Sequence, residues 1–440
     1  MPNDYMQRES TVAVYGLGRV GASLAAVMLR HGFSVIGVDV DKDKVDRINS
    51  KEKIFSLEPH VDESFEKGIE EGTFRATVDL KWASEASKYK IITVPVPLVL
   101  KTPDFTNIKQ ASEAIGKGIK KGDVLIVESS VPVGTTRQVV AKTVSDVSGL
   151  KPEDDYLLGY SPERIYEGRA VYDIEENYPK VVSGYGKNSL EEIAQLYSKV
   201  AKKGVIKMSS IEAAELEKLA EGLYRDVNIA LANELALFAQ RLGVDFWEVR
   251  NAANSQPYSN IHKPGAGVGG NCIPVYPYYV LHTANRLGFH FRLVESARWV
   301  NERMPLVVVS NFVELFILNK KSLRTAAILG LAFRGDTDDD RLSPSYDIID
   351  RLRALNVTVK VHDPYVKKPS RSDVQVSNDL TETLAKTDGV IMVTDHSVYK
   401  DLDYDKIAKM SGNDPIIYDA RGILYGKPKI YVLGTGYKGP

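Results

Sequence analysis

Residues 11–39, TVAVYGLGRVGASLAAVMLRHGFSVIGVD, contain two apolar runs that flank a glycine-rich turn and a helical pattern. The first run covers residues 11–15 and leads into GLGRVG at residues 16–21, and the second covers residues 35–39 and ends in Asp39. A strand, a GxGxxG turn, a helix and a second strand ending in an acid form the βαβ unit that binds a dinucleotide. An isolated GxGxxG is a weak signal, but these surroundings make it specific. The stretch therefore predicts an α/β domain with a doubly wound parallel sheet.

Each glycine of the turn has a physical role in this unit. Gly16 makes the tight turn, Gly18 lets the backbone approach the pyrophosphate, and Gly21 lets the helix pack against the strand. The pyrophosphate would lie at the helix N-terminus. Asp39 is placed to bind the ribose 2′-hydroxyl and would repel a 2′-phosphate, which favours NAD over NADP. The expected cofactor-binding residues of this unit are Gly16, Leu17, Gly18, Arg19, Val20, Gly21 and Asp39.

Composition narrows the class of protein. Hydrophobic content of 43% with 26% charged residues is ordinary for a globular chain, and a length of 440 residues indicates two or three domains. A formal net charge of -1 gives no field that would attract nucleic acid or a membrane surface. No apolar run approaches a membrane span, and the first ten residues lack the pattern of a signal peptide.

Cysteine and histidine usage points to a cytoplasmic protein without a metal site. One cysteine excludes an intrachain disulfide and suits a reducing cytosol. The seven histidines are scattered and show no zinc-ligand spacing, so no metal is expected.

Further apolar runs predict additional strands in the first domain, and each is followed by polar, proline or glycine residues. These runs cover residues 91–94, 124–127 and 156–160. Open α/β sheets bind ligands at the carboxyl ends of their strands. The segments expected there begin at Pro95, at residues 128–136 (ESSVPVGTT) and at residues 161–168 (SPERIYEG). The alternative for each segment is ordinary loop chemistry that caps the next helix.

A long helical pattern follows over residues 211–242, with leucines and other apolar residues recurring at threes and fours. Such a helix would span roughly 45 Å and would link two domains and offer a stripe to a partner subunit. Further helices are predicted after Asp245, from Cys272 to about Arg286 and over residues 295–316. From residue 325 a second α/β pattern begins, without GxGxxG, and its first strand is expected over residues 325–333. We therefore expect an NAD-binding Rossmann domain, a central helical and dimerisation domain and a C-terminal Rossmann-like domain, with bounds 1–208, 209–320 and 321–440.

The single cysteine lies in the predicted central domain at the end of residues 263–272, KPGAGVGGNC. Four glycines just ahead of Cys272 leave room for a close approach to the backbone or allow positive φ. A helical pattern follows the cysteine, and a thiol at a helix N-terminus favours the thiolate. The alternative is a buried, inert cysteine beside a glycine turn. A thiolate together with a nicotinamide cofactor indicates oxidation at the aldehyde level, through a thiohemiacetal and a thioester.

Several motifs together resemble a known family. They are residues 16–21, 128–136, 161–164, 218–234 (KLAEGLYRDVNIALANE), 263–272 and 330–339 (GLAFRGDTDD). This pattern, from about Val12 to Gly436, is similar to the UDP-glucose/GDP-mannose dehydrogenase family, and most like its UDP-N-acetylmannosamine and UDP-N-acetylglucosamine 6-dehydrogenase branch. The resemblance implies oxidation of the sugar C6 alcohol to a carboxylate with two NAD in sequence, a UDP-sugar-binding third domain, and a role in nucleotide-sugar metabolism and polysaccharide biosynthesis.

The resemblance also implies roles for individual residues. Cys272 matches the family nucleophile, Lys218 the lysine that stabilises an oxyanion or assists proton transfer, and Ser130 a water-binding threonine. Glu163 matches an acidic position of the loop at 161–168. The further cofactor contacts implied are Pro95, Ser130 and Arg341, and the substrate contacts are Glu163, Arg164, Lys218, Arg225, Asn228, Gly265, Gly267, Gly269 and Arg334.

The cationic residues also have an alternative interpretation as ordinary surface residues with no role in a site. Lys218 would by itself be a solvated residue on a helix face. Arg334 and Arg341 would by themselves form surface ion pairs with the acidic residues 336–340.

The sequence departs from the family pattern at two positions. Tyr276 stands where the family has an aspartate that orients water, and Gly222 stands where it often has asparagine. A tyrosine is a poor base near neutral pH. Either Lys218, Glu163 or Ser130 activates the water, or hydrolysis is slow. Smaller departures are Glu167, where the branch often has proline, and Asn271 in place of a common histidine.

Two alternative functions therefore stand beside a UDP-N-acetylhexosamine 6-dehydrogenase. One is a UDP-glucose 6-dehydrogenase, against which the run YRDVN at residues 224–228 argues. The other is a protein that binds a nucleotide sugar and NAD with impaired turnover.

Overall fold

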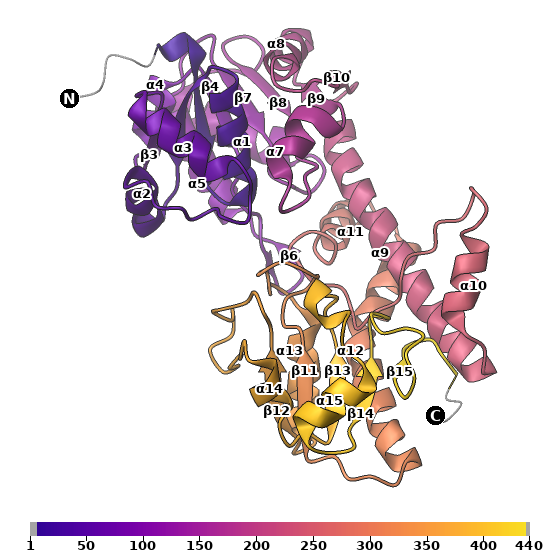
Figure 1. Ribbon diagram of the computed structural model, residues 1–440. Coiled ribbons are helices and arrows are strands. Elements are labelled where there is room, and N and C mark those ends of the chain that lie inside the picture. Colours follow the sequence, from indigo (N-terminus) through magenta and orange to yellow (C-terminus); the bar gives the residue numbers. More distant parts are fainter. Residues whose placement is uncertain (1–6, 437–440) are drawn as a thin grey trace. The chain divides into compact units, whose positions relative to one another are not determined.

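A computed structural model describes residues 7–436, so the outermost residues of the expected first and third domains, and most of the N-terminal segment considered above, lie outside it. The chain forms two compact units (Figure 1). The first comprises the chain to Glu221 together with Tyr278–Gly288, and the second comprises Gly222–Pro277 and the chain from Phe289. Two helices, α9 (Ile211–Leu242) and α11 (Tyr276–Arg286), belong in part to each unit.

The first unit contains an eight-stranded sheet in the order β10-β9-β8-β7-β4-β1-β2-β3. Neighbouring strands are parallel except β8 and β9, which are antiparallel. The strands are β1 (Thr11–Tyr15), β2 (Ser34–Val38), β3 (Phe74–Thr77), β4 (Tyr89–Ile92), β7 (Val124–Val127), β8 (Leu157–Tyr160), β9 (Lys180–Gly184) and β10 (Val205–Lys207). A short hairpin of β5 (Leu98–Val99) and β6 (Thr102–Pro103) follows β4.

Helices cover the sheet, and the four strands β1, β2, β4 and β7 are buried along their whole length. Near-continuous apolar strands are what burial on both faces of a parallel sheet requires. The helices are α1 (Arg19–Arg30), α2 (Lys42–Asn49), α3 (Val61–Glu70), α4 (Leu80–Ala86), α5 (Thr106–Gly116), α6 (Lys142–Ser148), α7 (Ala170–Tyr172) and α8 (Lys187–Ser198). The main core of this unit lies between the sheet and helices that include α1, α3 and α8.

The second unit begins with the later part of α9, which is followed by α10 (Phe246–Ala253). The side chain of Asp245 accepts a hydrogen bond from the Trp247 N–H and so caps α10. The sequence predicted the bounds of α9, the end of α11 near Arg286 and the helix start after Asp245, and all three are confirmed. Helix α12 (Arg292–Leu318) is longer than the expected 295–316.

A five-stranded parallel sheet in the order β12-β11-β13-β14-β15 forms the C-terminal part of the second unit. Its strands are β11 (Thr325–Leu329), β12 (Thr358–His362), β13 (Gly389–Met392), β14 (Ile416–Asp419) and β15 (Tyr431–Val432). Alternate residues face two separate cores. Ala326 and Ile328 pack towards α12 and α13 (Pro344–Ala354), whereas Ala327 and Leu329 pack towards α14 (Leu380–Leu384) and α15 (Tyr404–Ser411).

The strand predicted over residues 325–333 is shorter than expected. It ends at Leu329 because Gly330 turns the chain with φ +102°. The strand predicted over residues 91–94 also begins and ends earlier, at Tyr89 and Ile92. In both places the apolar run continues past the strand into the following loop. The apolar residues alone therefore placed the end of each strand too late.

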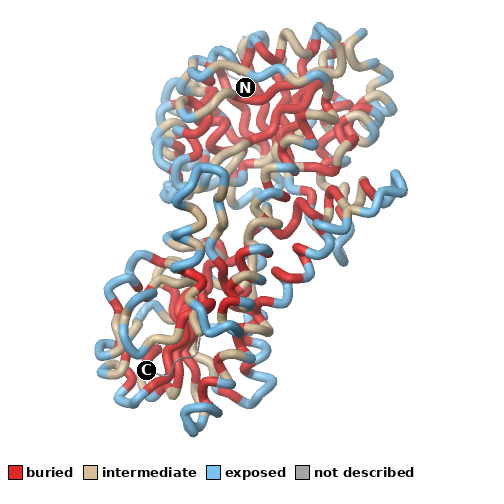
Figure 2. Tube along the Cα trace, turned by 90° about the vertical axis from the view of Figure 1, so that its right-hand side faces the viewer, coloured by how far each residue is buried: buried red, intermediate tan, exposed pale blue. Residues whose placement is uncertain are grey.

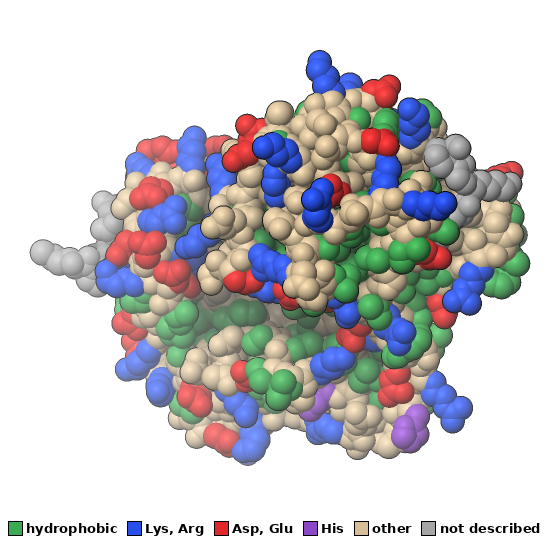
Figure 3. Space-filling model, turned by 90° about the horizontal axis from the view of Figure 1, so that it is seen from below, with side chains coloured by type: hydrophobic (Ala, Val, Ile, Leu, Met, Phe, Trp, Pro, Cys, Tyr) green, Lys and Arg blue, Asp and Glu red, His purple; other side chains and the backbone are tan. Residues whose placement is uncertain are grey.

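Burial and surface charge agree with a globular chain. Figure 2 shows the strands of each unit as buried segments surrounded by exposed loops and helices. On the face drawn in Figure 3, cationic and anionic side chains are interspersed. Within residues 7–436, no helix has the length and apolar character needed to cross a membrane. No group of three or more His, Cys, Asp or Glu side chains in the same residues could hold a metal ion.

Candidate active site

The turn between β1 and α1 has the geometry that a dinucleotide requires. Gly16 has φ +104°, and a Cβ on Gly21 would lie 1.9 Å from the Gly16 carbonyl oxygen, so both positions need glycine. A Cβ on Gly18 would meet nothing within 4 Å. Helix α1 also begins without a side-chain cap, which suits a pyrophosphate at its N-terminus. These residues therefore fit NAD.

Asp39 lies beside this turn, as predicted. Its carboxylate accepts hydrogen bonds from the Leu17 N–H (3.1 Å) and the Asp41 N–H (3.0 Å). The ammonium of Lys44 also lies 2.8 Å from Oδ2 of Asp39. Sequence reasoning missed Lys44, although its place in the first turn of α2, five residues after the acid, was a usable signal.

The loops after the neighbouring strands reach the same edge of the sheet. Arg19 forms an ion pair of 2.9 Å with Glu167, which joins the glycine turn to residues 161–168. Pro95 is exposed after β4, and Ser130 is half-buried after β7. The Tyr279 hydroxyl donates to the Val96 carbonyl and ties α11 to the loop that contains Pro95.

Glu215 on α9 holds the loop at residues 128–136. Its buried carboxylate accepts the Gly134 N–H (2.5 Å) and the Thr136 N–H (2.9 Å). Burial raises the pKa of Glu215 to about 7, against the effect of these donors. The loop that contains Ser130 is therefore anchored to the helix that contains Lys218.

Glu163 is buried, and its side-chain carboxylate and its backbone carbonyl have different partners. Its carboxylate pairs with Lys180, and its backbone carbonyl accepts a hydrogen bond from the ammonium of Lys218. Lys180 also lies 3.3 Å from Glu128, whose pKa burial raises to about 7. Burial alone would lower the pKa of Lys180, but the two carboxylates raise it. The charges of Lys180, Glu128 and Glu163 balance better if one of the two acids is protonated. The raised pKa of Glu128 favours its protonation.

Lys218 is not a solvated surface residue, because it is only 8% exposed. The structure brings it to the loop at 161–168, where sequence reasoning placed the substrate. Arg164 lies nearby, with its guanidinium donating to the Pro179 carbonyl and 3.6 Å from both Glu217 and Glu221. These contacts keep Arg164 on the same side of α9 as Lys218.

Cys272 is exposed, which excludes the buried, inert alternative. Its carbonyl accepts hydrogen bonds from the Val275 N–H (3.1 Å) and the Tyr276 N–H (3.0 Å), so the residue lies at the beginning of the turn that leads into α11. The thiol is therefore close to a helix N-terminus, as the sequence predicted.

The glycines before Cys272 are required by close contacts with the C-terminal α/β region. A Cβ on Gly265 would lie 2.8 Å from the Arg421 guanidinium, and one on Gly267 would lie 2.9 Å from Pro344. Cβ atoms on Gly269 and Gly270 would lie 2.6 and 2.8 Å from Phe333. The Gly270 N–H also donates to the Arg341 carbonyl at 2.8 Å. Residues 263–272 thus pack directly on residues 330–344.

Two asparagines of α9 hold the start of this segment. Asn228 donates to the Asn260 carbonyl and accepts from the His262 N–H, each at 2.8 Å. Asn233, which sequence reasoning did not single out, accepts from the Gly265 N–H at 2.9 Å. Arg225 is half-buried on the same helix. Five residues separate Asn228 and Asn233, which is not the spacing of three or four that marks one face of a helix, so the sequence pattern did not identify Asn233.

The two departures from the family pattern lie against each other. A Cβ on Gly222 would lie 2.4 Å from Cδ2 of Tyr276, so any side chain at this position would require the Tyr276 ring to move. Tyr276 is only 3% exposed, so its ring occupies space beside α9 that glycine leaves open. The substitutions at 222 and 276 therefore depend on each other.

The loop at residues 330–343 contains the remaining predicted residues. Arg334 is half-buried, and Arg341 donates to the carboxylate of Asp339 in the same loop at 2.7 Å. The ion-pair alternative thus describes Arg341 in this structure. Arg421, which sequence reasoning missed, follows β14, contacts Gly265 and lies 3.0 Å from Asp395. Its position after a strand's carboxyl end was the available signal.

Comparison with known proteins gives the family. Residues 10–201, 212–303 and 327–426 match the NAD binding, central and UDP binding domains of the UDP-glucose/GDP-mannose dehydrogenase family. A UDP-N-acetyl-D-mannosamine dehydrogenase of Pyrococcus horikoshii is 33% identical over 429 residues, covering 96% of this chain and 98% of the relative. A UDP-N-acetyl-D-glucosamine 6-dehydrogenase of Pseudomonas aeruginosa is 34% identical over 421 residues, covering 95% and 98%.

A solved structure, that of UDP-D-ManNAc dehydrogenase from Pyrococcus horikoshii, has a TM-score of 0.89 with 30% identity, covering 97% of this chain and 99% of that one. The chain belongs to the UDP-glucose/GDP-mannose dehydrogenase family. It is an NAD-dependent oxidoreductase with an N-terminal NAD-binding domain, a central helical domain and a C-terminal UDP-binding domain. The predicted family, fold class and cofactor are confirmed.

Proposed function

We propose that the protein oxidises the C6 alcohol of a UDP-N-acetylhexosamine to the carboxylate, in two NAD-dependent steps that share Cys272. The first step removes a hydride and a proton from the alcohol and leaves an aldehyde. The Cys272 thiolate then adds to the aldehyde carbon, and loss of a second hydride converts the thiohemiacetal to a thioester. Water cleaves the C–S bond, which releases the carboxylate and returns the thiolate. Bound NAD supplies the hydride acceptor in both oxidations.

The observation that supports this proposal most directly is the docking of the cysteine segment on the C-terminal region. Gly269 and Gly270 lie against Phe333, and the Gly270 N–H bonds to Arg341, two residues before the exposed thiol. Residues 327–426 match the family's UDP-binding domain. A nucleotide bound there would lie in the same compact unit as the nucleophile.

The roles that we propose for the other residues follow from charge and position. Lys218, a buried cation, would stabilise the oxyanion of the thiohemiacetal and of thioester hydrolysis. Arg225, Arg334 and Arg421 would contact the anionic part of the substrate. Because the Glu163 carboxylate pairs with Lys180, we assign to Glu163 the placement of Lys218 through its carbonyl, and leave water activation to Lys218 or Ser130.

The choice of an N-acetylhexosamine is supported by the printed names of relatives. Proteins from Pyrococcus horikoshii, Pseudomonas aeruginosa and Campylobacter jejuni that are 33–34% identical to this chain are named dehydrogenases of UDP-N-acetyl-D-mannosamine or UDP-N-acetyl-D-glucosamine. UDP-glucose is the second candidate. The buried Tyr276, in place of an acid, favours a third candidate, a binding protein that stalls before hydrolysis.

One experiment separates the three. Purified protein is mixed with NAD and, in turn, UDP-N-acetylmannosamine, UDP-N-acetylglucosamine and UDP-glucose, and NADH is followed by absorbance. Two NADH per N-acetylated sugar are expected. Turnover of UDP-glucose alone would contradict the substrate assignment. A burst of NADH equal to the enzyme, with sugar bound to Cys272 in the mass spectrum, would identify the stalled thioester.

We also propose that the protein works in the cytoplasm as a homodimer formed through α9. Tyr224, Leu231 and Phe238 recur every seven residues and are each about half exposed, and the lone cysteine suits a reducing compartment. Sedimentation should give a dimer, and Leu231→Glu with Phe238→Glu should give a monomer. A monomeric wild type would contradict this proposal without affecting the chemistry.

A further inference from the structure

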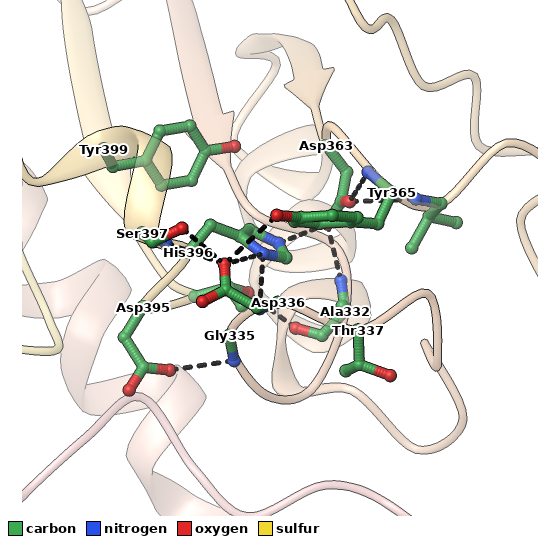
Figure 4. Close-up of polar contacts among 12 residues, drawn as sticks. Ala332, Gly335, Asp336, Thr337, Asp363, Tyr365, Asp395, His396, Ser397 and Tyr399 are labelled. Carbon is green, nitrogen blue, oxygen red and sulfur yellow. Dashed lines mark hydrogen bonds and ion pairs between the residues drawn. The ribbon is translucent and has the colours of Figure 1, made fainter. Parts of the chain in front are cut away.

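A buried histidine in the second unit has no place in the chemistry proposed above. His396 follows β13, is fully buried and lies among Asp336, Asp363 and Asp395 (Figure 4). Its Nε2 lies 2.9 Å from Oδ2 of Asp363, and its Nδ1 lies 2.9 Å from the backbone nitrogen of Asp336. The three strands β11, β12 and β13 each contribute a loop to this group, which we name the His396 cluster.

Hydrogen bonding identifies the tautomer of His396. A backbone N–H can only donate, so Nδ1 accepts from Asp336 and the ring proton lies on Nε2, which donates to Asp363. The two ring nitrogens therefore have different tasks. Nδ1 holds the loop after β11, and Nε2 holds the carboxylate that follows β12.

The His396 cluster holds both ends of residues 331–336. Oδ2 of Asp363 accepts the Leu331 N–H at 2.7 Å and the Ala332 N–H at 2.9 Å. The Gly335 N–H donates to the Asp395 carboxylate at 3.0 Å, and the Asp336 carboxylate accepts a hydrogen bond from the Ser397 N–H at 2.8 Å. Figure 4 shows these bonds converging on one short segment. The segment is thus tied to the ends of two other strands.

The opposite side of the same segment contacts the residues before Cys272. Phe333 lies between the attachments at Ala332 and Gly335, and its side chain meets the backbone of Gly269 and Gly270. The Phe333 N–H bonds to the Asp339 carbonyl at 2.9 Å, and Asp339 in turn holds Arg341, whose carbonyl accepts the Gly270 N–H. A shift of residues 331–336 would therefore be transmitted to the cysteine segment.

We propose that His396 is a positioning residue for Cys272, which acts by holding residues 331–336 under the glycines at 265–270. The functional meaning of this inference rests on the proposed role of Cys272, but the mechanical coupling does not. Asp336 has φ +56°, so the bond from its N–H to Nδ1 holds a backbone conformation that an isolated loop would rarely adopt.

Two substitutions distinguish positioning from simple stability. His396→Asn places an amide oxygen near the position of Nδ1 and keeps the bond to Asp336. His396→Gln reaches the position of Nε2 and keeps only the bond to Asp363. Each removes one buried hydrogen bond, and the bond to the Asp363 carboxylate, which His396→Asn removes, is the stronger of the two. A purely structural role therefore predicts that His396→Asn is at least as harmful as His396→Gln. Tyr399→Phe is the matched control, because the Tyr399 hydroxyl bonds to His362 in the same cluster without touching residues 331–336.

Hydrogen exchange by mass spectrometry measures the coupling without substrate or NAD. His396→Gln should speed amide exchange in residues 264–272 and 331–337 by about 10-fold, the factor for loss of one buried hydrogen bond. His396→Asn should stay within about 3-fold of wild type, and Tyr399→Phe should leave residues 264–272 unchanged. Equal rates in the Asn and Gln variants, or wild-type exchange of residues 264–272 in His396→Gln, would overturn the proposal.

A second variant covers the case in which His396→Gln does not fold. Asp336→Gly keeps the positive φ and removes the carboxylate that bonds to Ser397, and it should speed exchange in the same two segments. With an active UDP-sugar, His396→Gln should lower kcat while the KM for NAD is unchanged. A wild type without turnover would refute the proposed function, but the exchange measurement would still decide the role of His396.

Discussion

The first and second α/β regions share one backbone turn and use it differently. In the first, Gly16 (φ +104°) follows β1, its N–H bonds to the Val38 carbonyl, and the next N–H, of Leu17, bonds to Asp39. In the second, Gly330 (φ +102°) follows β11, its N–H bonds to His362, and the N–H of Leu331 bonds to Asp363. In both regions, the N–H that follows the glycine donates to an aspartate located just after the second strand.

The two regions differ in the segment that follows the turn. Helix α1 begins at Arg19, directly after the turn, which is the arrangement that suits a dinucleotide at the helix N-terminus. Helix α13 begins only at Pro344, and residues 330–343 intervene. Asp39 remains partly exposed, whereas Asp363 is fully buried under His396. The same turn thus leaves its carboxylate partly exposed in the first region and anchors a long loop in the second.

The largest expected effect comes from replacing Cys272, which should stop the oxidation chemistry without affecting NAD binding. Cys272→Ser should lower net acid formation by at least about 10³-fold, because an alcohol is a far weaker nucleophile than a thiolate. NAD affinity, measured by calorimetry, should not change, because the glycine turn and Asp39 lie in the first unit and Cys272 lies in the second. Unchanged turnover would refute the nucleophile assignment.

Gly330 in the second region and Gly18 in the first differ in their tolerance of a side chain. Gly330→Ala should destabilise the protein by about 3 kcal/mol, from positive φ and a contact with Thr394. A Cβ there would lie only 2.2 Å from the Thr394 Cβ. Gly18→Ala meets nothing, so it should leave the thermal midpoint unchanged and weaken NAD binding. Equal thermal midpoints for the two variants would break the comparison.

The buried carboxylate should make the second region sensitive to acid. Burial alone would raise the pKa of Asp363, but the His396 hydrogen bond and backbone N–H groups lower it from 3.8 to about 2. The folded state therefore binds this proton less tightly than the unfolded state. The carboxylate contributes about 2 kcal/mol above pH 3.8, and this is lost as the pH falls towards 2.

Asp363→Asn should accordingly flatten the decline of the thermal midpoint between pH 4 and pH 2. Asp373 is a suitable control, because Arg371 lowers its pKa to about 2 at an exposed position. Asp373→Asn should change the decline less, since solvent screens the pair. A steeper decline in Asp363→Asn than in wild type would contradict the assignment.

The contact between Gly222 and Tyr276 should appear as a coupling energy. Gly222→Ala alone gains helix propensity but clashes with the Tyr276 ring, and Tyr276→Ser alone leaves a cavity. Together they should be less harmful than their sum by about 1–2 kcal/mol. Additive changes in stability would show that the two positions are independent.

The smallest effect concerns Asp39, the partly exposed carboxylate of the first region. Asp39→Ala should reduce the preference for NAD over NADP by about 10-fold, equivalent to about 1.4 kcal/mol. Lys44→Ala should strengthen that preference, because Lys44 neutralises part of the Asp39 charge. Kinetics with both cofactors measure the ratio, and an unaltered preference in Asp39→Ala would move the ribose contact elsewhere.

Sequence reasoning succeeded where the signal was local. The glycine turn at residues 16–21, the long helix ending before Gly243 and the helix after Cys272 depend on neighbours within a few residues, and each was predicted with nearly correct bounds. It overextended β11 to residue 333, because an apolar run does not reveal where a glycine turns the chain. It also proposed ligand approach for the glycines at 265, 267 and 269, where protein atoms account for the close contacts.

The sequence by itself determined the dinucleotide-binding unit, the order of helical and α/β regions and the placement of the lone thiol before a helix. These properties follow from periodicity and from φ preferences, which act along the chain. Only the tertiary structure decided that Lys218 meets the Glu163 carbonyl, that Tyr276 lies on Gly222 and that His396 holds Asp363. These partners are 33 or more residues apart, and their contact depends on how strands and helices pack, which no local pattern encodes.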